Sequence, residues 1–311
     1  MNLKIMTLAP GFRYSSVAAP IPAGNDLGER LTVDITPRIP RRPTGVKLRR
    51  GVTYGAGLRL ELHTPAVAGR RPLVVYLPGG GFVVAPRTMA RRERAFIAAA
   101  GYVVASVEYR TIRQRATLNE GLSDIQAAIA YLIGHADDYG IDPDAIALWG
   151  ESAGGYLASQ AGLTDPRVRA VVDQFGASDL ARIADGFDPR MQAALADPRH
   201  PIRRYRATEV NPIDNVRPDA PAFLLLHGDD DRIIPPAQTI MLHRALRAAG
   251  ADSTYYLLAG AGHGRLAFNR QQARQWSSMQ LMTIINEFLD RHLKQLNAGL
   301  GHRAGPSEPA G

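Results

Sequence analysis

Hydrophobic residues along most of the chain form short continuous runs that alternate with longer stretches of helical spacing. The run at 73–77 has the length and β-branched content of a buried strand, and further strand candidates lie at 102–107, 145–149, 168–172, 221–226 and 253–258. Apolar residues recur at helical spacing over 91–100, 119–135, 237–249 and 271–296. This alternation predicts a mainly parallel sheet with helices on both faces, which is an α/β fold in one large domain.

The segment that precedes this pattern predicts a β-hairpin. Strand candidates at 46–54 and 58–63 flank Gly55-Ala56-Gly57, which is a hairpin signal. Apolar and charged residues alternate strictly over 58–62, as is typical of an edge strand with one face in water.

In three further segments the hydrophobic residues follow no sustained helical or strand spacing. Residues 1–45 are rich in proline, glycine and arginine and predict an irregular arm, which is a candidate lid. Residues 176–221 are also irregular, with a helical piece near 190–196, and lie where a small cap would form. The tail at 299–311 is polar, and we expect it to be disordered.

Composition narrows the class of protein. With 311 residues, 45% of them hydrophobic, the chain can bury a large core. No apolar run is long enough to span a membrane and the N-terminus carries no convincing export signal, so we expect a cytoplasmic protein. The absence of cysteine excludes disulfides and thiol catalysis. The net charge of +8 comes from scattered arginines that are not interleaved with aromatic residues, which indicates a solvated basic surface and no nucleic-acid partner.

The sequence Gly150-Glu151-Ser152-Ala153-Gly154 follows a strand candidate and leads into small, helix-compatible residues. A strand, a sharp turn and a helix around Gly-x-Ser-x-Gly are typical of a nucleophile elbow, with Ser152 at the apex of the turn. Glycines are needed on both sides of the apex, because strand and helix approach closely there. The elbow therefore indicates a nucleophilic serine. A plain tight turn is the competing interpretation, and finding a base and an acid for the serine would exclude it.

A serine hydroxyl needs a histidine base and a carboxylate to orient that base, and in elbow enzymes the acid precedes the histidine in the chain. His263 lies in a glycine-rich loop after the final strand candidate and is the best base. The acid is Asp229, Asp230 or Asp231, which follow the strand candidate at 221–226. This acidic run lacks the ligand spacing of a calcium loop, so we expect no metal. We expect His227 to be a packed or hydrogen-bonded anchor of the same loop.

Four further histidines are expected on the surface, namely His63, His135, His243 and His292. Four phenylalanines are candidates for an apolar substrate pocket or for ordinary core: Phe12, Phe82, Phe175 and Phe187.

Ester attack also requires donors for the oxyanion. One is expected to be the N–H of Ala153, directly after the nucleophile, and the others should come from the loop after the strand at 73–77, where Gly79-Gly80-Gly81 exposes bare backbone. A phosphate-binding loop is the competing interpretation of these glycines, but no Gly-Lys-Ser/Thr follows them.

Taken together, these motifs resemble the α/β-hydrolase superfamily, and within it the bacterial esterase/lipase branch that includes hormone-sensitive-lipase-like and feruloyl-esterase-like enzymes. The residues that carry the resemblance are Pro78-Gly79-Gly80-Gly81-Phe82, Glu108-Tyr109-Arg110, Gly150 to Gly155, Asp231 with Pro235, and His263. The resemblance implies an α/β-hydrolase domain over 46–298. It further implies Ser152 as nucleophile, Asp231 as acid, His263 as base, and the N–H groups of Gly80, Gly81 and Ala153 as the oxyanion hole.

One departure from this branch concerns the glycine loop, which normally opens with histidine where this chain has Pro78. Proline has no N–H, but the donors are expected at the second and third glycines, so the hole should be retained while its hydrogen-bonded support must differ.

These features predict a serine carboxylic-ester hydrolase that acts through an acyl-enzyme on a small-molecule ester and needs no cofactor. An amidase, peptidase, lactonase or thioesterase would use the same triad. A non-catalytic binding protein on this fold is a third alternative, although that class usually loses a triad residue. The sequence leaves the oligomeric state open, a homodimer included.

Overall fold

The computed structural model describes residues 28–36, 38–55, 57–183, 211–266 and 270–294, and its centre is one nine-stranded sheet. The strand order is β1-β9-β8-β7-β6-β4-β5-β3-β2. Every described strand except β3 runs in the same direction, since only the β3 pairings with β5 and β2 are antiparallel. The strands are β1 (Glu29–Leu31), β2 (Val46–Tyr54), β3 (Leu58–Pro65), β4 (Arg71–Leu77), β5 (Val103–Val107), β6 (Ile141–Glu151), β7 (Val168–Gln174), β8 (Ala222–Gly228) and β9 (Ser253–Leu258).

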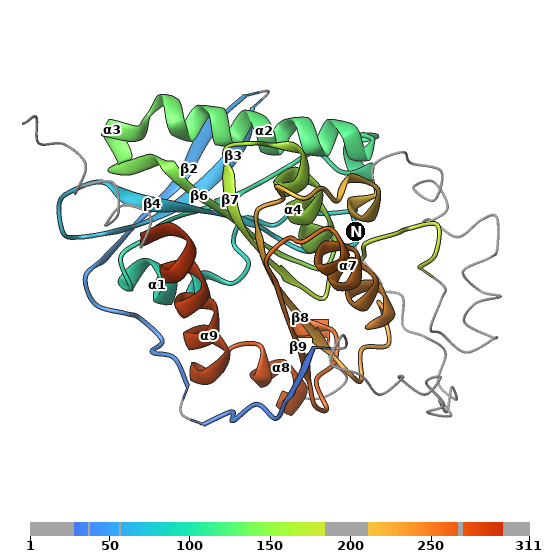
Figure 1. Cartoon of the computed structure of the whole chain (residues 1–311). Helices are drawn as coiled ribbons and strands as arrows, with labels where there is room; N and C mark the ends of the chain where they lie inside the picture. Colours follow the sequence, from blue (N-terminus) through green and yellow to red (C-terminus); the bar gives the residue numbers. More distant parts are fainter. Residues whose placement is uncertain (1–27, 37, 56, 184–210, 267–269, 295–311) are drawn as a thin grey trace, which may run out of the picture.

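Helices cover both faces of the sheet (Figure 1), which confirms the predicted fold class. Apolar side chains of α2 (Leu118–Gly134), α4 (Ala153–Thr164) and α7 (Ala237–Ala248) form one core with the sheet. Those of α1 (Arg91–Ala99) and α9 (Met279–Leu289) form the other. The central strands are buried on both faces, which is why their sequences are continuous apolar runs. No helix in the described ranges is long and apolar enough to cross a membrane.

The hairpin of β2 and β3 forms as predicted, but the prediction that β3 is an edge strand is wrong. The outer strand is β2, whereas β3 lies between β2 and β5. Glu61, expected in water, is 1% exposed and accepts hydrogen bonds from Arg91 and Arg94 of α1. The charged face of β3 is therefore covered by a helix whose arginines compensate the buried carboxylate, a device that periodicity alone does not reveal.

Two histidines expected on the surface are buried. His63 lies beside Arg94 under α1, and burial together with the charge of Arg94 lowers the pKa of His63 to about 3. His243 on α7 is bonded through Nδ1 to the hydroxyl of Ser253 at 2.8 Å. Both are buried, and His135 and His292 are half-buried.

The described part of the N-terminal arm belongs to the sheet. Residues 29–31 form β1, which pairs in parallel with β9, and Val33 and Ile39 are buried in the core beneath α9. A three-residue strand with two charged side chains gives no periodic signal, so the sequence did not predict it. The candidate lid residues at 1–27, the helical piece near 190–196 and the tail at 299–311 lie outside the described residues.

The C-terminal segment is not the single helix predicted over 271–296. It consists of α8 (Arg270–Gln275), a break, α9, and a π-helical turn at Asp290–Lys294. The break occurs because the buried Ser278 caps α9, its hydroxyl accepting the N–H of Leu281 at 3.2 Å. Two short helices thus replace one, and Trp276 in the break lies near the loop that carries His263.

Candidate active site

Ser152 occupies the sharp turn between β6 and α4, with φ 55° and ψ −121°, a region that non-glycine residues rarely adopt. The turn is held by two hydrogen bonds, from the Ser152 N–H to the Gln174 carbonyl at 2.9 Å and from the Tyr156 N–H to the Ser152 carbonyl at 3.0 Å. A Cβ at Gly150 would lie 2.1 Å from the Gly154 oxygen, and one at Gly154 would lie 2.0 Å from the Leu77 oxygen. The glycines of the motif are therefore required by backbone contact, as the sequence predicted.

Ser152, His263 and Asp231, which come from three separate segments, are joined by hydrogen bonds. His263 Nε2 lies 2.8 Å from Ser152 Oγ, and His263 Nδ1 lies 2.7 Å from Asp231 Oδ2. The other carboxylate oxygen, Oδ1, accepts the N–H groups of Ile233 and Ile234 at 2.9 and 3.0 Å. Burial alone would raise the pKa of Asp231, but the His263 charge and the hydrogen bonds from His227 and His263 outweigh it and hold this pKa well below its ordinary value.

The three adjacent aspartates have different partners. Asp229 binds Arg30 of β1 and the N–H of Gly260, and Asp230 binds Arg232 and Gln272. Of the three, Asp231 is the one that reaches His263. Asp231 is therefore the candidate acid among the three adjacent aspartates.

His227 is the hydrogen-bonded anchor that the sequence predicted. It is fully buried, with Nδ1 2.6 Å from the Thr239 hydroxyl and Nε2 2.9 Å from the Ile234 carbonyl. Its Nε2 also lies 3.2 Å from Asp231 Oδ2. The residue ties β8 to the loop that carries the acid.

The imidazole of His263 is fixed by aromatic packing. The ring of Phe175 lies edge-on to it at 4.8 Å and also packs against Trp276 at 4.4 Å. Trp276 donates its indole N–H to the Gly262 carbonyl at 2.8 Å. Of the pocket candidates, Phe175 is thus core that supports the base, Phe82 is buried against Tyr156, and Phe12 and Phe187 lie outside the described residues.

The glycine loop after β4 lies directly against the elbow. A Cβ at Gly79 would lie 2.8 Å from the Glu151 oxygen and 3.2 Å from Ser152 Cβ. Gly80 and Gly81 have φ of 154° and 61°, and the Gly80 carbonyl accepts the N–H of Val83 at 3.0 Å. Within the described chain, the N–H groups of Gly80, Gly81 and Ala153 donate to no acceptor. These three N–H groups are therefore candidate donors for an oxyanion hole.

Two carboxyl groups near the elbow, the half-buried Glu151 and the buried Asp173, were not predicted. Glu151 accepts the hydroxyl of Tyr76 at 2.7 Å, and burial raises its pKa. Asp173 accepts the Ser159 hydroxyl at 2.8 Å and the Gly176 N–H at 2.9 Å, and burial raises its pKa to about 6. A Cβ at Gly155 would lie 2.2 Å from Asp173 Oδ1, so this carboxyl fills the space that the second glycine leaves. The adjacent glycines 154 and 155 were the only sequence signal for the buried Asp173.

Within the described ranges, no cluster of three or more His, Asp and Glu side chains is arranged to hold a metal ion.

Comparison with known proteins places this geometry in a family. The model of the BD-FAE family matches residues 60–246. The chain belongs to the BD-FAE family. This match and the fold confirm the predicted resemblance to α/β-hydrolases of the esterase/lipase branch. The matched range contains the elbow and Asp231, and His263 lies beyond it.

Curated relatives and solved structures are consistent with membership of the BD-FAE family. The probable carboxylic ester hydrolase LipM of Mycobacterium tuberculosis is 31% identical over 210 residues, which are 61% of this chain and 48% of that protein. Esterase LipC of the same organism is 33% identical over 217 residues, 62% and 53% of the two chains. A truncated carbohydrate esterase from gut microbiota shares the fold, with TM-score 0.69 and 23% identity over 82% of this chain and 99% of that one. This chain spans about half the length of the curated relatives named here.

The elbow contacts predict the result of Gly150→Ala. The added methyl group would overlap the Gly154 carbonyl, a backbone atom that cannot move without displacing α4. We expect a loss of about 1–3 kcal/mol or more in the free energy of unfolding, measured by urea titration. Gly134→Ala is the matched control, because that helical glycine has nothing within 4 Å of a new Cβ and gains helix propensity. Equal stability of the two variants would contradict the contact.

The raised pKa of Asp173 predicts a pH-dependent stability. Because the folded-state pKa of about 6 lies above the ordinary value of 3.8, the contribution of this carboxyl is largest below pH 4 and is lost as the pH rises to 6. Relative to Asp173→Asn, which does not titrate, the wild type should lose about 3 kcal/mol of unfolding free energy across this window. Urea titrations of both proteins from pH 4 to 7 measure the difference, and a difference that does not change with pH would exclude the effect.

Proposed function

We propose that this protein is a serine carboxylic-ester hydrolase. The observation that carries the proposal is the continuous hydrogen-bonded chain from Asp231 through His263 to Ser152, with distances of 2.7 and 2.8 Å. A hydroxyl, an imidazole and a buried carboxylate in this order are the groups that activate a serine nucleophile.

In the proposed reaction, Ser152 Oγ attacks the ester carbonyl while His263 Nε2 takes its proton. Asp231 accepts a hydrogen bond from His263 Nδ1 and stabilises the imidazolium that forms. The N–H groups of Gly80, Gly81 and Ala153 donate to the oxyanion of the tetrahedral intermediate. As the intermediate collapses, His263 returns the proton to the departing alkoxide. A water molecule then attacks the acyl carbon as His263 takes its proton, and His263 returns that proton to Ser152 Oγ as the acid leaves.

Esters are the favoured substrates because an alkoxide leaves with little assistance, whereas an amine must be protonated first. The similarity to LipM, a probable carboxylic ester hydrolase, and to LipC, an esterase, supports the same class. An amidase, peptidase, lactonase or thioesterase would use the same atoms, and no described contact favours one of them. The cytoplasmic location and the oligomeric state stay predictions.

The proposal predicts different effects for neighbouring aspartates. Asp231→Asn should lower kcat by about ten-thousand-fold, because an amide cannot hold the imidazole in the required tautomer or compensate its charge. Asp230→Asn is the matched control, since its side chain contacts Arg232 and Gln272, and its kcat should stay within about twofold of wild type. Both are measured on p-nitrophenyl esters of varied acyl length and on aryl amides, with Ser152→Ala as the baseline.

Labelling by an organophosphate tests the nucleophile independently of substrate choice. The wild type should be modified at Ser152 and Ser152→Ala should not. Hydrolysis that survives Ser152→Ala, or an intact chain that is never labelled, would contradict the proposal and favour a binding protein on this fold.

A further inference from the structure

The residues that open the glycine loop have no polar side chain with which to attach the loop to the rest of the chain. Gly79, Gly80 and Gly81 have no side chains, and Pro78, which opens the loop, has neither an N–H nor a polar side chain. A loop whose donors must lie at fixed positions relative to Ser152 therefore needs support from another part of the chain.

The first support is a single buried hydroxyl. Tyr109, in the segment after β5, donates its hydroxyl to the Pro78 carbonyl at 2.6 Å, and the residue is 2% exposed. The same carbonyl faces the elbow, because a Cβ at Gly154 would lie 2.8 Å from it. The Tyr109 hydroxyl thus bonds the atom at which the loop meets the first turn of α4.

Two more hydrogen bonds hold the far side of the glycines. The Thr111 hydroxyl donates to the Val83 carbonyl at 2.8 Å, and the Ile112 N–H donates to the Phe82 carbonyl at 3.0 Å. Residues 109–112 therefore bond the loop both before and after Gly79-Gly80-Gly81.

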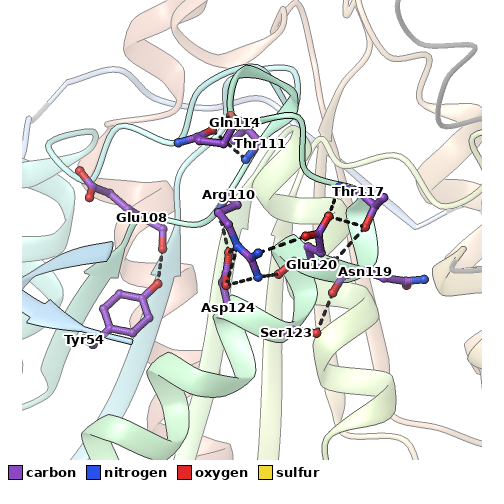
Figure 2. A network of polar contacts seen from close by, with 10 residues as sticks. All are labelled: Tyr54, Glu108, Arg110, Thr111, Gln114, Thr117, Asn119, Glu120, Ser123 and Asp124. Atoms are coloured by element: carbon purple, nitrogen blue, oxygen red, sulfur yellow. Dashed lines mark hydrogen bonds and ion pairs between the residues drawn. The ribbon is translucent and has the colours of Figure 1, made fainter. Parts of the chain in front are cut away.

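The supporting segment is itself fixed to α2, as Figure 2 shows. Arg110 reaches across to Asp124, donating Nε to Oδ2 and Nη2 to Oδ1, each at 2.9 Å, while its own N–H donates to Oδ2 at 2.8 Å. The guanidinium also binds Glu120, whose other oxygen accepts the N–H of Thr117 in a capping box. Asp124 is buried, so this bidentate pair is a rigid attachment of the segment to the helix.

We propose that Tyr109 is a positioning residue of the active site, whose hydroxyl holds the donors at Gly80 and Gly81 in register with Ser152. The inference rests on the proposed function. It also explains how a loop that opens with Pro78 keeps its place. The competing interpretation is an ordinary core tyrosine whose hydrogen bond contributes only to stability.

The test compares Tyr109→Phe with Tyr54→Phe. Tyr54 is the matched control, because the residue is as buried as Tyr109 and its hydroxyl donates to the backbone carbonyl of Glu108, outside the glycine loop (Figure 2). The readouts are kcat and KM on a p-nitrophenyl ester, the inhibition constant of a trifluoromethyl ketone that forms an oxyanion on Ser152, and the free energy of unfolding.

For Tyr109→Phe we expect kcat to fall by about tenfold to a hundredfold, less than the full loss of an oxyanion donor, with KM within about twofold. The ketone should bind more weakly by the factor lost in kcat/KM. Tyr54→Phe should keep kcat and ketone affinity while losing similar stability. Thr111→Val, which removes the hydrogen bond on the other side of the glycines, should show a smaller fall in kcat and in ketone affinity. This variant is the substitute test if Tyr109→Phe does not fold.

Two results overturn the inference. If Tyr109→Phe and Thr111→Val lose stability but keep kcat and ketone affinity, these hydroxyls are structural only and the proposed function stands. If the wild type shows no hydrolysis dependent on Ser152, the proposed function fails and the inference fails with it.

Discussion

The close approach of two backbones at the end of β4 is the constraint on which the site depends. The first turn of α4 contacts the Leu77 and Pro78 carbonyls so closely that Gly154 can carry no side chain. This contact brings the nucleophile, the start of a helix and the glycine loop together without any intervening atom. The strained φ of Ser152 persists because strands on both sides, through Gln174 and β4, fix the turn.

Carboxyl groups that are buried or half-buried against the sheet have compensating partners. Asp124 binds Arg110, Glu61 binds Arg91 and Arg94, and Glu151 accepts the hydroxyl of Tyr76. Removing one partner of such a pair costs more than the pair contributes, because the remaining charge stays buried. Pairs of this kind hold α1 and α2 in one orientation against the sheet. The loops between strands and helices are held in position as a result.

The local sequence pattern was sufficient to predict the central strands, the main helices and the elbow. Burial on both faces of the sheet leaves continuous apolar runs, and backbone contact at the elbow demands glycine at 150 and 154. The pattern also pointed to the loops that carry Asp231 and His263. It failed at β1, whose pairing depends on an exposed edge of β9, and at Glu61, whose burial depends on arginines 30 residues away. It missed Asp173, Glu151 and the support by Tyr109 for the same reason, since a partner distant in sequence decides whether a polar side chain can be buried.

The electrostatics of His263 follow from these long-range contacts. The imidazole is 4% exposed, between the edge of Phe175 and the carboxylate of Asp231. A positive charge that forms there is far from water, so it is stabilised mainly by a negative charge already in place. The charge of His263 and the hydrogen bonds from His227 and His263 hold the pKa of Asp231 below its ordinary value despite burial. In the proposed reaction, the carboxylate would be in place before Ser152 loses its proton, and its stabilising effect on the imidazole would grow only as that proton arrives.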